Sequence, residues 1–577
     1  MIRYHLELDD LHRHHYRVTL TLPNPAPLQL LSLPVWIPGS YLVREFSRHL
    51  SAIEAHQGRR TVALTQLDKH TWQAACSGRA ALTVSWRVYA FDNSVRCAWL
   101  DTQRGFFNGT GVFLAAQGRE ADEHRVTFGP LPDGWDIATG LPEVAPREYA
   151  APDYDALIDH PFELGAFWRG TFTACGVEHE FVVAGALPSF DGERLLADTR
   201  RICEAQIRFW HGDAPAPFAR YVFLLNTVDE GYGGLEHRNS TALICNRRDL
   251  PRRGEPGLND GYVTLLGLIS HEYFHTWNVK RLKPCAFAPY DLRGENYTEL
   301  LWFFEGFTSY YDDLFLVRTG LIDQTRYLRL VAKTVNQVLG TPGRRVQSVA
   351  QSSFDAWVKY YRPDENSANA TVSYYTKGAL VAQAFDLTLR QEGKGTLDDV
   401  MRGLWRRSGG GPIGEDDIAA VLAEVGGRSF AAELAAWVHG TDDLPTQALL
   451  AAHGADAQRE RPLFAQRLGA RLTESAQGLK VQSVQHGGAA DQAGLSAGDE
   501  LLALGDWRVV KPEDLALYGA FEQPQPLLVS RDRRLLRLTL PAAAVEGAVA
   551  LSWQAKPVAR TRRLRAAWLG SPGPAGA

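Results

Sequence analysis

The chain has 577 residues, of which 45% are hydrophobic and 22% are charged, and its formal net charge is −5 at pH 7. This length exceeds what a single hydrophobic core supports, so we expect several domains. The composition is ordinary for a globular protein. The weak negative charge gives no reason to expect nucleic acid or an anionic membrane surface as a partner.

Several features bear on the location of the protein. The first residues, MIRYHLELDDLHRHHYR, contain no apolar core of a signal peptide. No run of about 18 apolar residues occurs, so we expect no membrane span. The six cysteines lie far apart and form no CxxC pair, which favours reduced thiols over disulfides or a cysteine metal site. We therefore expect a cytoplasmic protein.

The pattern of the sequence changes along the chain. Residues 1–165 are expected to be rich in β-strands, because stretches such as YRVTLTL and ALTVSWRVYAF alternate or run apolar between turn residues. Residues 166–455 combine strands such as RYVFLLN with a mainly helical second part. Residues 461–545 return to short strands, and residues 546–577 are expected to be a C-terminal tail with a disordered end. The predicted fold class is a multidomain α+β protein.

The stretch HEYFH, which begins at His271, places polar residues inside an apolar run. YVTLLGLISHEYFHTWNV has no proline, and Asn259 or Asp260 can cap its start, so we expect a helix. Residues four positions apart share a helix face, which lets His271 and His275 bind one zinc ion. Glu272 can then act as general base toward water at the metal. The alternative is a chance motif, although a buried carboxylate is unfavourable without a partner.

A catalytic zinc site needs a third protein ligand. Glu305 is the only charged residue in LLWFFEGFTSYY, which otherwise reads as a buried helix, so its carboxylate is expected to bind metal or a charged partner. Glu299 is a weaker candidate, because on one helix it would point about 120° away from Glu305. Two histidines and Glu305 would form a thermolysin-type ligand set for one Zn²⁺ per chain.

HEYFHTWN followed by WFFEGFTSYY resembles the glycyl aminopeptidase family of zinc peptidases. PVWIPGSYLVREF, GFFNGTG and LIDHPFELG fit the same family. The resemblance covers nearly the whole chain. It implies an N-terminal β-rich domain over 1–165, a thermolysin-like catalytic domain over 166–455 and a PDZ domain over 461–545. It also implies a mechanism related to that of larger neutral aminopeptidases, which use a GxMEN anchor and a tyrosine in YxKG.

The resemblance places the substrate anchor in GYGGLEHRNS. Glu236 would bind the free α-amine of a peptide, and the backbone of Gly233 and Gly234 would contact the peptide chain. An ammonium group needs a carboxylate, and glycines let another backbone approach closely. His237 stands where the larger relatives have asparagine. The structural alternative is a charged β-turn.

SYYTKGAL matches YxKG, with Tyr375 as its tyrosine. A phenol near the metal can donate a hydrogen bond to the oxyanion that develops during peptide hydrolysis. Tyr374 is the competing candidate, and a packing role for both tyrosines is the structural alternative.

HGGAADQAGLSAGDELLALGDWRV resembles the core of a PDZ domain. The preceding RLGARL would bind a peptide carboxylate and pair with its backbone through Leu468, Gly469, Ala470 and Arg471. The alternative is a PDZ fold used only for packing, because a fold does not establish a ligand.

Together these features predict a zinc aminopeptidase whose partners are peptides with a free N-terminus, and a C-terminal peptide at the PDZ domain is a further candidate. The preference for small N-terminal residues, Gly or Ala, is implied by the resemblance alone. Two alternatives stay open. One is a PDZ-assisted endopeptidase or processing protease, and the other is a non-catalytic scaffold that binds peptides.

Overall fold

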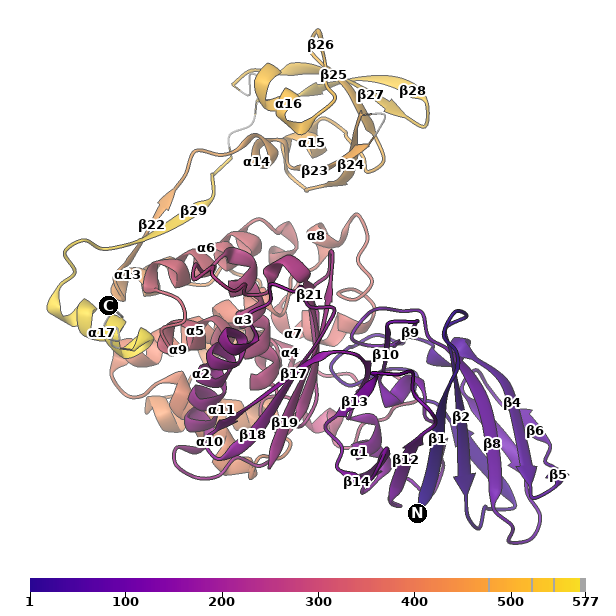
Figure 1. The fold of residues 1–577 in the computed structure, drawn as a ribbon. Coiled ribbons are helices and arrows are strands. Elements are labelled where there is room, and N and C mark those ends of the chain that lie inside the picture. The colour runs from indigo at the N-terminus through magenta and orange to yellow at the C-terminus, as the bar shows by residue number, and fades with distance from the viewer. Residues whose placement is uncertain (476–477, 520–521, 543–544, 571–577) are drawn as a thin grey trace. The chain divides into compact units, whose positions relative to one another are not determined.

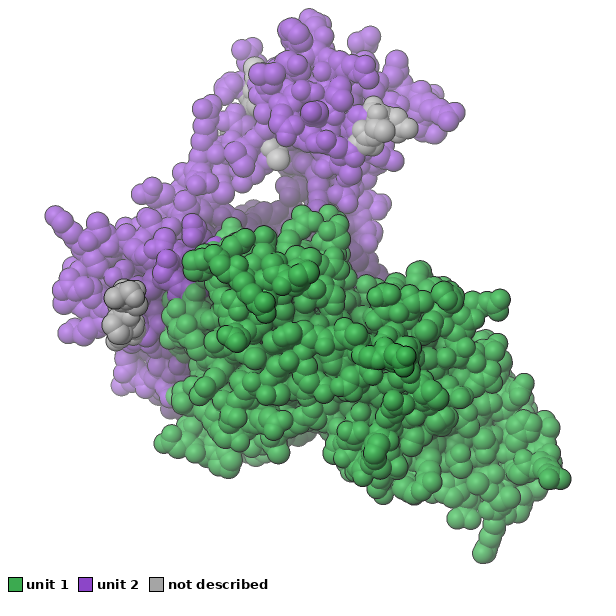
Figure 2. Space-filling model, viewed as in Figure 1, with its two compact units in different colours: residues 1–297, 311–321, 401–414 green, residues 298–310, 322–400, 415–577 purple. Residues whose placement is uncertain are grey.

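The computed structural model describes residues 1–475, 478–519, 522–542 and 545–570 (Figure 1). The chain divides into two compact units (Figure 2). The first comprises residues 1–297, 311–321 and 401–414, and the second comprises residues 298–310, 322–400 and 415–577. The disordered end expected for the tail falls on residues 571–577, which lie outside the described residues.

The first unit begins with three β-sheets. Eight strands form a sheet in the order β14-β15-β12-β1-β2-β8-β4-β5, and two four-stranded sheets have the orders β13-β16-β10-β9 and β11-β3-β7-β6. Their bounds are β1 (Ile2–Asp10), β2 (His15–Leu22), β3 (Leu28–Ser32), β4 (Leu50–Gln57), β5 (Arg60–Thr61), β6 (Leu64–Gln66), β7 (Thr71–Ala75), β8 (Leu82–Tyr89), β9 (Ala98–Leu100), β10 (Arg104–Phe107), β11 (Ala115–Ala116), β12 (His124–Phe128), β13 (Asp136–Thr139), β14 (Glu143–Ala145), β15 (Glu148–Ala151) and β16 (Phe162–Gly165).

Alternation of polar and apolar residues explains these sheets. Strand β2 has the sequence HYRVTLTL and buries every second side chain, while it pairs antiparallel with β1 and β8. The buried faces form one hydrophobic core that includes Tyr4, Trp86, Phe107 and Phe162. The predicted β-rich N-terminal part is confirmed.

A five-stranded sheet follows in the order β17-β18-β19-β21-β20. Its strands are β17 (Trp168–Ala174), β18 (Val177–Ala184), β19 (Arg220–Val228), β20 (Gly233–Glu236) and β21 (Ser240–Asn246). Strands β18, β19 and β21 are parallel neighbours and largely buried, as expected of a sheet covered on both faces. Strand β20 pairs antiparallel with β21 and ends the sheet. Its outer edge can therefore accept an extended peptide.

Helix α3 (Asp260–Phe274) lies in the same unit and begins at the predicted cap. The side chain of Asn259 accepts a hydrogen bond from the backbone N–H of Tyr262 at 2.7 Å. Helix α2 (Gly192–His211) packs against α3. The amide of Gln206 donates to the carbonyl and the hydroxyl of Ser270, at 2.9 and 3.0 Å.

The helix expected to run to Val279 ends earlier. Helix α3 ends at Phe274, and the ring Nδ1 of His275 lies 2.7 Å from the carbonyl oxygen of Asn278. Val279 then adopts a φ of 102°, which is incompatible with a continuing helix. The turn places His275 directly after the helix instead of within it.

Helices dominate the chain between α3 and residue 453, as predicted, and the described residues contain no helix long and apolar enough to cross a membrane. The helices are α4 (Leu301–Phe304), α5 (Gly306–Arg318), α6 (Gln324–Leu339), α7 (Val349–Phe354), α8 (Ser367–Ala370), α9 (Thr376–Glu392), α10 (Leu397–Ser408), α11 (Glu415–Gly426), α12 (Ala431–Trp437) and α13 (Thr446–Ala452). The single buried helix expected around Glu305 is in fact two, because α4 ends before Glu305 and α5 begins after it.

The C-terminal part is formed around a two-stranded antiparallel ribbon of β22 (Ala455–Arg459) and β29 (Val549–Trp553). Between these strands lies a six-stranded sheet in the order β23-β24-β25-β27-β28, with β26 paired to β25. Its elements are α14 (Phe464–Leu468), β23 (Ala470–Ser475), β24 (Gly478–Val484), α15 (Ala489–Gln492), β25 (Glu500–Leu504), β26 (Trp507–Arg508), α16 (Pro512–Tyr518), β27 (Gln525–Arg531) and β28 (Arg534–Leu540). Residues 546–577, expected as a tail, include β29 and helix α17 (Ala559–Leu569).

The buried imidazole of His179 on β18 predicts acid sensitivity. Its Nδ1 lies 3.0 Å from the carbonyl of Val177 and its Nε2 lies 2.8 Å from the hydroxyl of Tyr273. Burial lowers the pKa of His179 to about 4. The folded state therefore holds the ring neutral, while the unfolded chain binds a proton below about pH 6.5. We expect this group to lower the free energy of unfolding by about 2 kcal/mol as the pH falls from 7.5 to 5.

Urea unfolding of the metal-free protein at pH 7.5 and pH 5 measures this effect. The variant His179→Gln keeps an acceptor for the hydroxyl of Tyr273 and cannot titrate. It should lose less stability than the wild type over this interval. Equal losses in the two proteins would contradict the assignment to His179.

Candidate functional site

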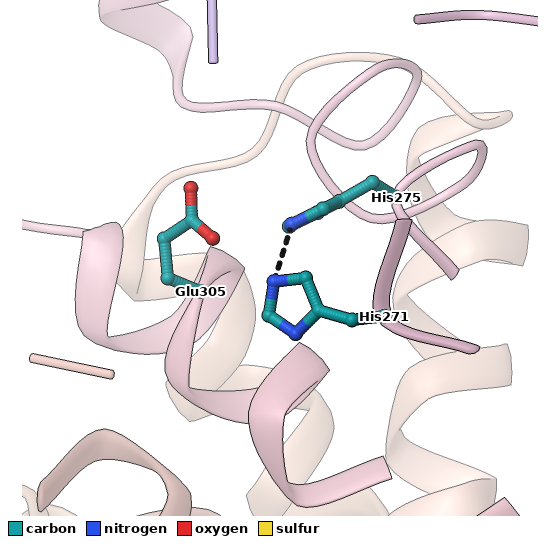
Figure 3. Close-up of side chains that lie close together, drawn as sticks. All are labelled: His271, His275 and Glu305. Carbon is teal, nitrogen blue, oxygen red and sulfur yellow. Dashed lines mark hydrogen bonds between the residues drawn. The ribbon is translucent and has the colours of Figure 1, made fainter. Parts of the chain in front are cut away.

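Two histidine rings point their Nε2 atoms toward each other at the C-terminal end of α3. His271 lies in the last turn of the helix, and His275 follows directly after it. Their Nε2 atoms are 3.0 Å apart (Figure 3). The predicted shared face is therefore observed, although His275 reaches it from a turn.

The other ring nitrogens indicate which tautomer each histidine adopts. His275 Nδ1 lies 2.7 Å from the carbonyl oxygen of Asn278, and His271 Nδ1 lies 3.0 Å from a carboxylate oxygen of Asp312. Both partners are acceptors, so each Nδ1 donates a hydrogen bond, and in the neutral rings each Nε2 can then bind a metal ion. The donor set thus fits a metal ion.

Glu305 places a third candidate ligand atom beside the two rings. It is almost completely buried at the break between α4 and α5. One ligand atom from each of His271, His275 and Glu305 lies within 4.8 Å of the other two. Two neutral imidazoles and one carboxylate match the preferences of a catalytic zinc ion. Glu299 lies before α4 instead of on a helix shared with Glu305, so the helical angle used to compare them does not apply.

Strand β20 carries the predicted anchor residues. Gly234 and Glu236 are two positions apart and so share a face of the strand. A methyl group on Gly234 would overlap the carboxylate of Glu272, so only glycine lets the strand pass this side chain. Glu236, Glu272 and His275 form a second group with ligand atoms within 4.8 Å of one another. Gly233 begins the strand on the opposite face.

The loop that contains Gly39 lies against the carboxylate of Glu236. Gly39 has a φ of +97°, and a methyl group there would come within 2.6 Å of the carboxylate carbon of Glu236. Side chains of other residue types would therefore displace Glu236. The sequence analysis missed this role, because WIPGS carries no sign that its glycine meets a residue almost 200 positions later.

A buried ion cluster holds the segment that follows Glu236. The carboxylate of Asp159 accepts from Lys280 at 2.7 Å and from the side chain of Arg238 at 2.8 Å, and it lies 3.3 Å from the ring of His237. Burial would raise the pKa of Asp159, but Lys280 and Arg238 hold it well below its usual range. Burial lowers the pKa of His237 to about 4, so this ring stays neutral. His237 therefore has a structural role next to Glu236, the predicted substrate anchor.

The structure distinguishes the two adjacent tyrosines. Tyr374 is completely buried, whereas Tyr375 is partly exposed, and its hydroxyl lies 3.3 Å from that of Tyr361. Burial raises the pKa of Tyr375 well above its ordinary value, and the charge of Glu305 adds to this effect. The phenol consequently keeps its proton and can donate a hydrogen bond. The ring of Tyr360 packs at a tilt against both tyrosines, and burial raises the pKa of Tyr360 too.

The residues expected to bind a C-terminal peptide lie at the start of the six-stranded sheet. Leu468 ends α14 and is buried in the local core, while Ala470 begins β23. Gly469, with a φ of +67°, links them and lies against the backbone of Gly488. Arg471 is exposed on β23, which ends the sheet.

Asp312 is the main residue that the sequence analysis missed. It follows Glu305 by seven positions, in SYYDD, and its carboxylate is bonded to the ring of His271. Burial raises the pKa of Asp312, whereas the bond from His271 lowers it. The only signal in the sequence is an acidic pair that follows two tyrosines, which gives no indication of its partner.

The sequence matches known families in three regions. Residues 3–166 match the M61 peptidase N-terminal domain, residues 264–381 match the M61 glycyl aminopeptidase family, and residues 457–517 match the PDZ domain. No curated protein sequence matches the chain.

Two solved structures are similar to this chain to different degrees. The crystal structure of an aminopeptidase N family protein from Idiomarina loihiensis is 38% identical, with a TM-score of 0.93, and the match covers 99% of this chain and 100% of that chain. An M1 zinc metallopeptidase from Deinococcus radiodurans is 16% identical, with a TM-score of 0.47, over 77% of this chain and 94% of that chain. The second likeness is too distant to support an inference.

The bond between Asp312 and His271 predicts an effect on metal affinity. Asp312→Ala should weaken metal binding about 10–100-fold, because the ring of His271 loses the group that fixes its tautomer and orientation. Metal retained against increasing chelator concentrations, measured by elemental analysis, gives the affinity. The neighbouring substitution Asp313→Ala is the control, and an equal loss in both variants would argue against a specific role for Asp312.

Proposed function

Because this chain belongs to the M61 glycyl aminopeptidase family, and is therefore a metallopeptidase, we propose that it is a zinc aminopeptidase that removes small N-terminal residues, Gly or Ala, from peptides. The observation that supports this most strongly is the convergence of the Nε2 atoms of His271 and His275 with the carboxylate of Glu305. The preference for Gly or Ala rests on the family alone.

In this proposal the residues divide into three roles. His271, His275 and Glu305 hold one Zn²⁺, which would lower the pKa of water and polarise the peptide carbonyl. Glu272 accepts a proton from the attacking water and passes it to the leaving amine. Tyr375 donates a hydrogen bond to the oxyanion as negative charge develops on the carbonyl oxygen.

The substrate would bind along strand β20. Its free α-amine would pair with the carboxylate of Glu236, and its backbone would lie beside Gly233 and Gly234, whose missing side chains leave room. The buried position of Glu236 supports this role, because a charge-assisted hydrogen bond to an ammonium group is stronger away from water. A blocked N-terminus could not make that bond.

The proposal includes four parts of the chain: an N-terminal domain over 1–165, a catalytic domain over 166–455, a PDZ domain over 461–545 and a C-terminal tail over 546–577. The PDZ domain would bind the C-terminus of a peptide through residues 468–471. The end position of β23 supports this, since a peptide can add to a strand with a free edge. A PDZ domain that binds C-termini is also compatible with the second candidate function, an endopeptidase that recruits its substrates by their C-termini.

The role of Glu272 is tested by an isosteric change. Glu272→Gln should retain zinc and lose about 10²–10⁴-fold in kcat, because the ligands remain while proton transfer fails. Zinc content and turnover of an alanyl or glycyl anilide are measured on the same preparation. Near-normal turnover of the zinc-loaded variant would exclude Glu272 as the base.

The role of Glu236 decides between aminopeptidase and endopeptidase. Glu236→Ala should lower kcat/KM for a peptide with a free N-terminus about 10–150-fold, since a charge-assisted hydrogen bond to the ammonium is lost. The N-acetylated peptide should be a poor substrate of both proteins and respond little to the change. If the wild type cleaves the acetylated peptide internally as fast as the free one, the endopeptidase is the correct reading.

A further inference from the structure

Helices α5 and α9 touch through their backbones at two glycines. A methyl group on Gly306 would lie 2.5 Å from the Cα of Gly378, and one on Gly378 would lie 2.9 Å from the Cα of Gly306 and 2.7 Å from the carbonyl oxygen of Trp302. Real Cβ atoms essentially never approach other atoms to less than 3.0 Å. The obstacles are backbone atoms, which cannot rotate away, so any side chain at this contact must push the two helices apart.

The contact lies beside two residues of the proposed mechanism. Glu305 immediately precedes Gly306, and Tyr375 immediately precedes α9 and lies three positions before Gly378. The backbone N–H of Gly378 donates to the carbonyl of Tyr374 at 3.2 Å, and a methyl on Gly306 would lie 2.9 Å from that same oxygen. The position of Gly306 is therefore tied to the first turn of α9, where the Tyr375 side chain originates.

A second contact joins the same helices farther along. The hydroxyl of Tyr310 on α5 donates to Asp386 on α9 at 2.6 Å, and it accepts a hydrogen bond from the indole of Trp568 on α17 at 2.9 Å. All three side chains are buried. Counted from the glycines, this second contact lies one turn farther along α5 and two turns farther along α9. It would keep the helices together there, so a side chain at either glycine would mainly separate the starts of the two helices, where Glu305 and Tyr375 lie.

We propose that Gly306 and Gly378 are positioning residues that set the separation between the carboxylate of Glu305 and the phenol of Tyr375. The roles of those two side chains rest on the proposed function. The glycines touch neither substrate nor metal. They bring the start of α5 and the start of α9 close enough for a metal ligand and an oxyanion donor to serve one reacting carbonyl.

The central experiment combines Gly378→Ala with Tyr375→Phe. Gly378→Ala should lower kcat about 10–100-fold with KM changed less than about threefold, because a displacement of about 1 Å can cost a reaction 10²-fold. In the Tyr375→Phe background the same substitution should lower kcat much less, since the donor that it misplaces is already absent. A loss of helix stability alone would reduce both backgrounds equally.

Gly306→Ala provides an independent readout through the metal. It should weaken zinc retention against chelator about 10-fold, because Glu305 is displaced while His271 and His275 are unchanged. Gly267→Ala in α3 is the matched control, since a methyl group there makes only an ordinary 3.5 Å contact with Asp313. The control should retain activity and metal.

Tyr310→Phe keeps the proposal testable if the glycine variants do not fold. This isosteric change releases the second contact and should lower kcat about 3–10-fold, with the loss again absent in the Tyr375→Phe background. Equal losses in both backgrounds together with wild-type zinc affinity in Gly306→Ala would overturn the proposal. If Tyr375→Phe by itself leaves kcat unchanged, the oxyanion role fails instead, and zinc affinity in Gly306→Ala still decides the positioning role through Glu305.

Discussion

The pair of imidazole nitrogens at the end of α3 is the constraint on which the proposed centre depends. The Nε2 atoms of His271 and His275 point toward each other and lie 3.0 Å apart, an arrangement that suits two ligands of one metal ion. It persists because each ring is fixed from behind, one by the carboxylate of Asp312 and the other by the carbonyl of Asn278. The end of α3 at Phe274 is part of this design, since the turn after it supplies that carbonyl.

The proposed centre also needs a strand with small side chains beside the carboxylates of Glu236 and Glu272. Strand β20 ends its sheet, and its glycines leave the backbone exposed to close approach. Gly234 accommodates Glu272, and Gly39 from the N-terminal β-rich part accommodates Glu236. Asp159 then fixes the following segment through a desolvated ion cluster, whose removal in part would leave unpaired buried charge. Two carboxylates can thus stay close together without being crowded by neighbouring side chains.

In the second unit, glycines likewise allow two segments of the chain to approach closely. Two glycines let α5 and α9 meet backbone to backbone, and the bonds among Trp568, Tyr310 and Asp386 hold the helices farther along. Trp568 belongs to the last described helix, so the C-terminal segment contributes to a core that begins more than 250 positions earlier. A terminal segment with a basic, polar composition can still be structural when one aromatic residue is buried.

The sequence by itself determined the family of this protein, because the motifs of that family are residue types at short spacings. HEYFH predicted two metal ligands and a base, and the isolated charge of Glu305 in an apolar run required a partner. The β-rich N-terminal part, the helical part and the PDZ domain were likewise predictable from periodicity and family motifs. Tertiary structure alone decided which distant groups meet. It ended α3 at Phe274, broke the helix at Glu305, paired Asp312 with His271, and set Gly39 against Glu236. Asp312 and Gly39 meet residues far from them in the chain, and the ends of α3 and α4 depend on backbone geometry that the apolar pattern of residue types did not reveal.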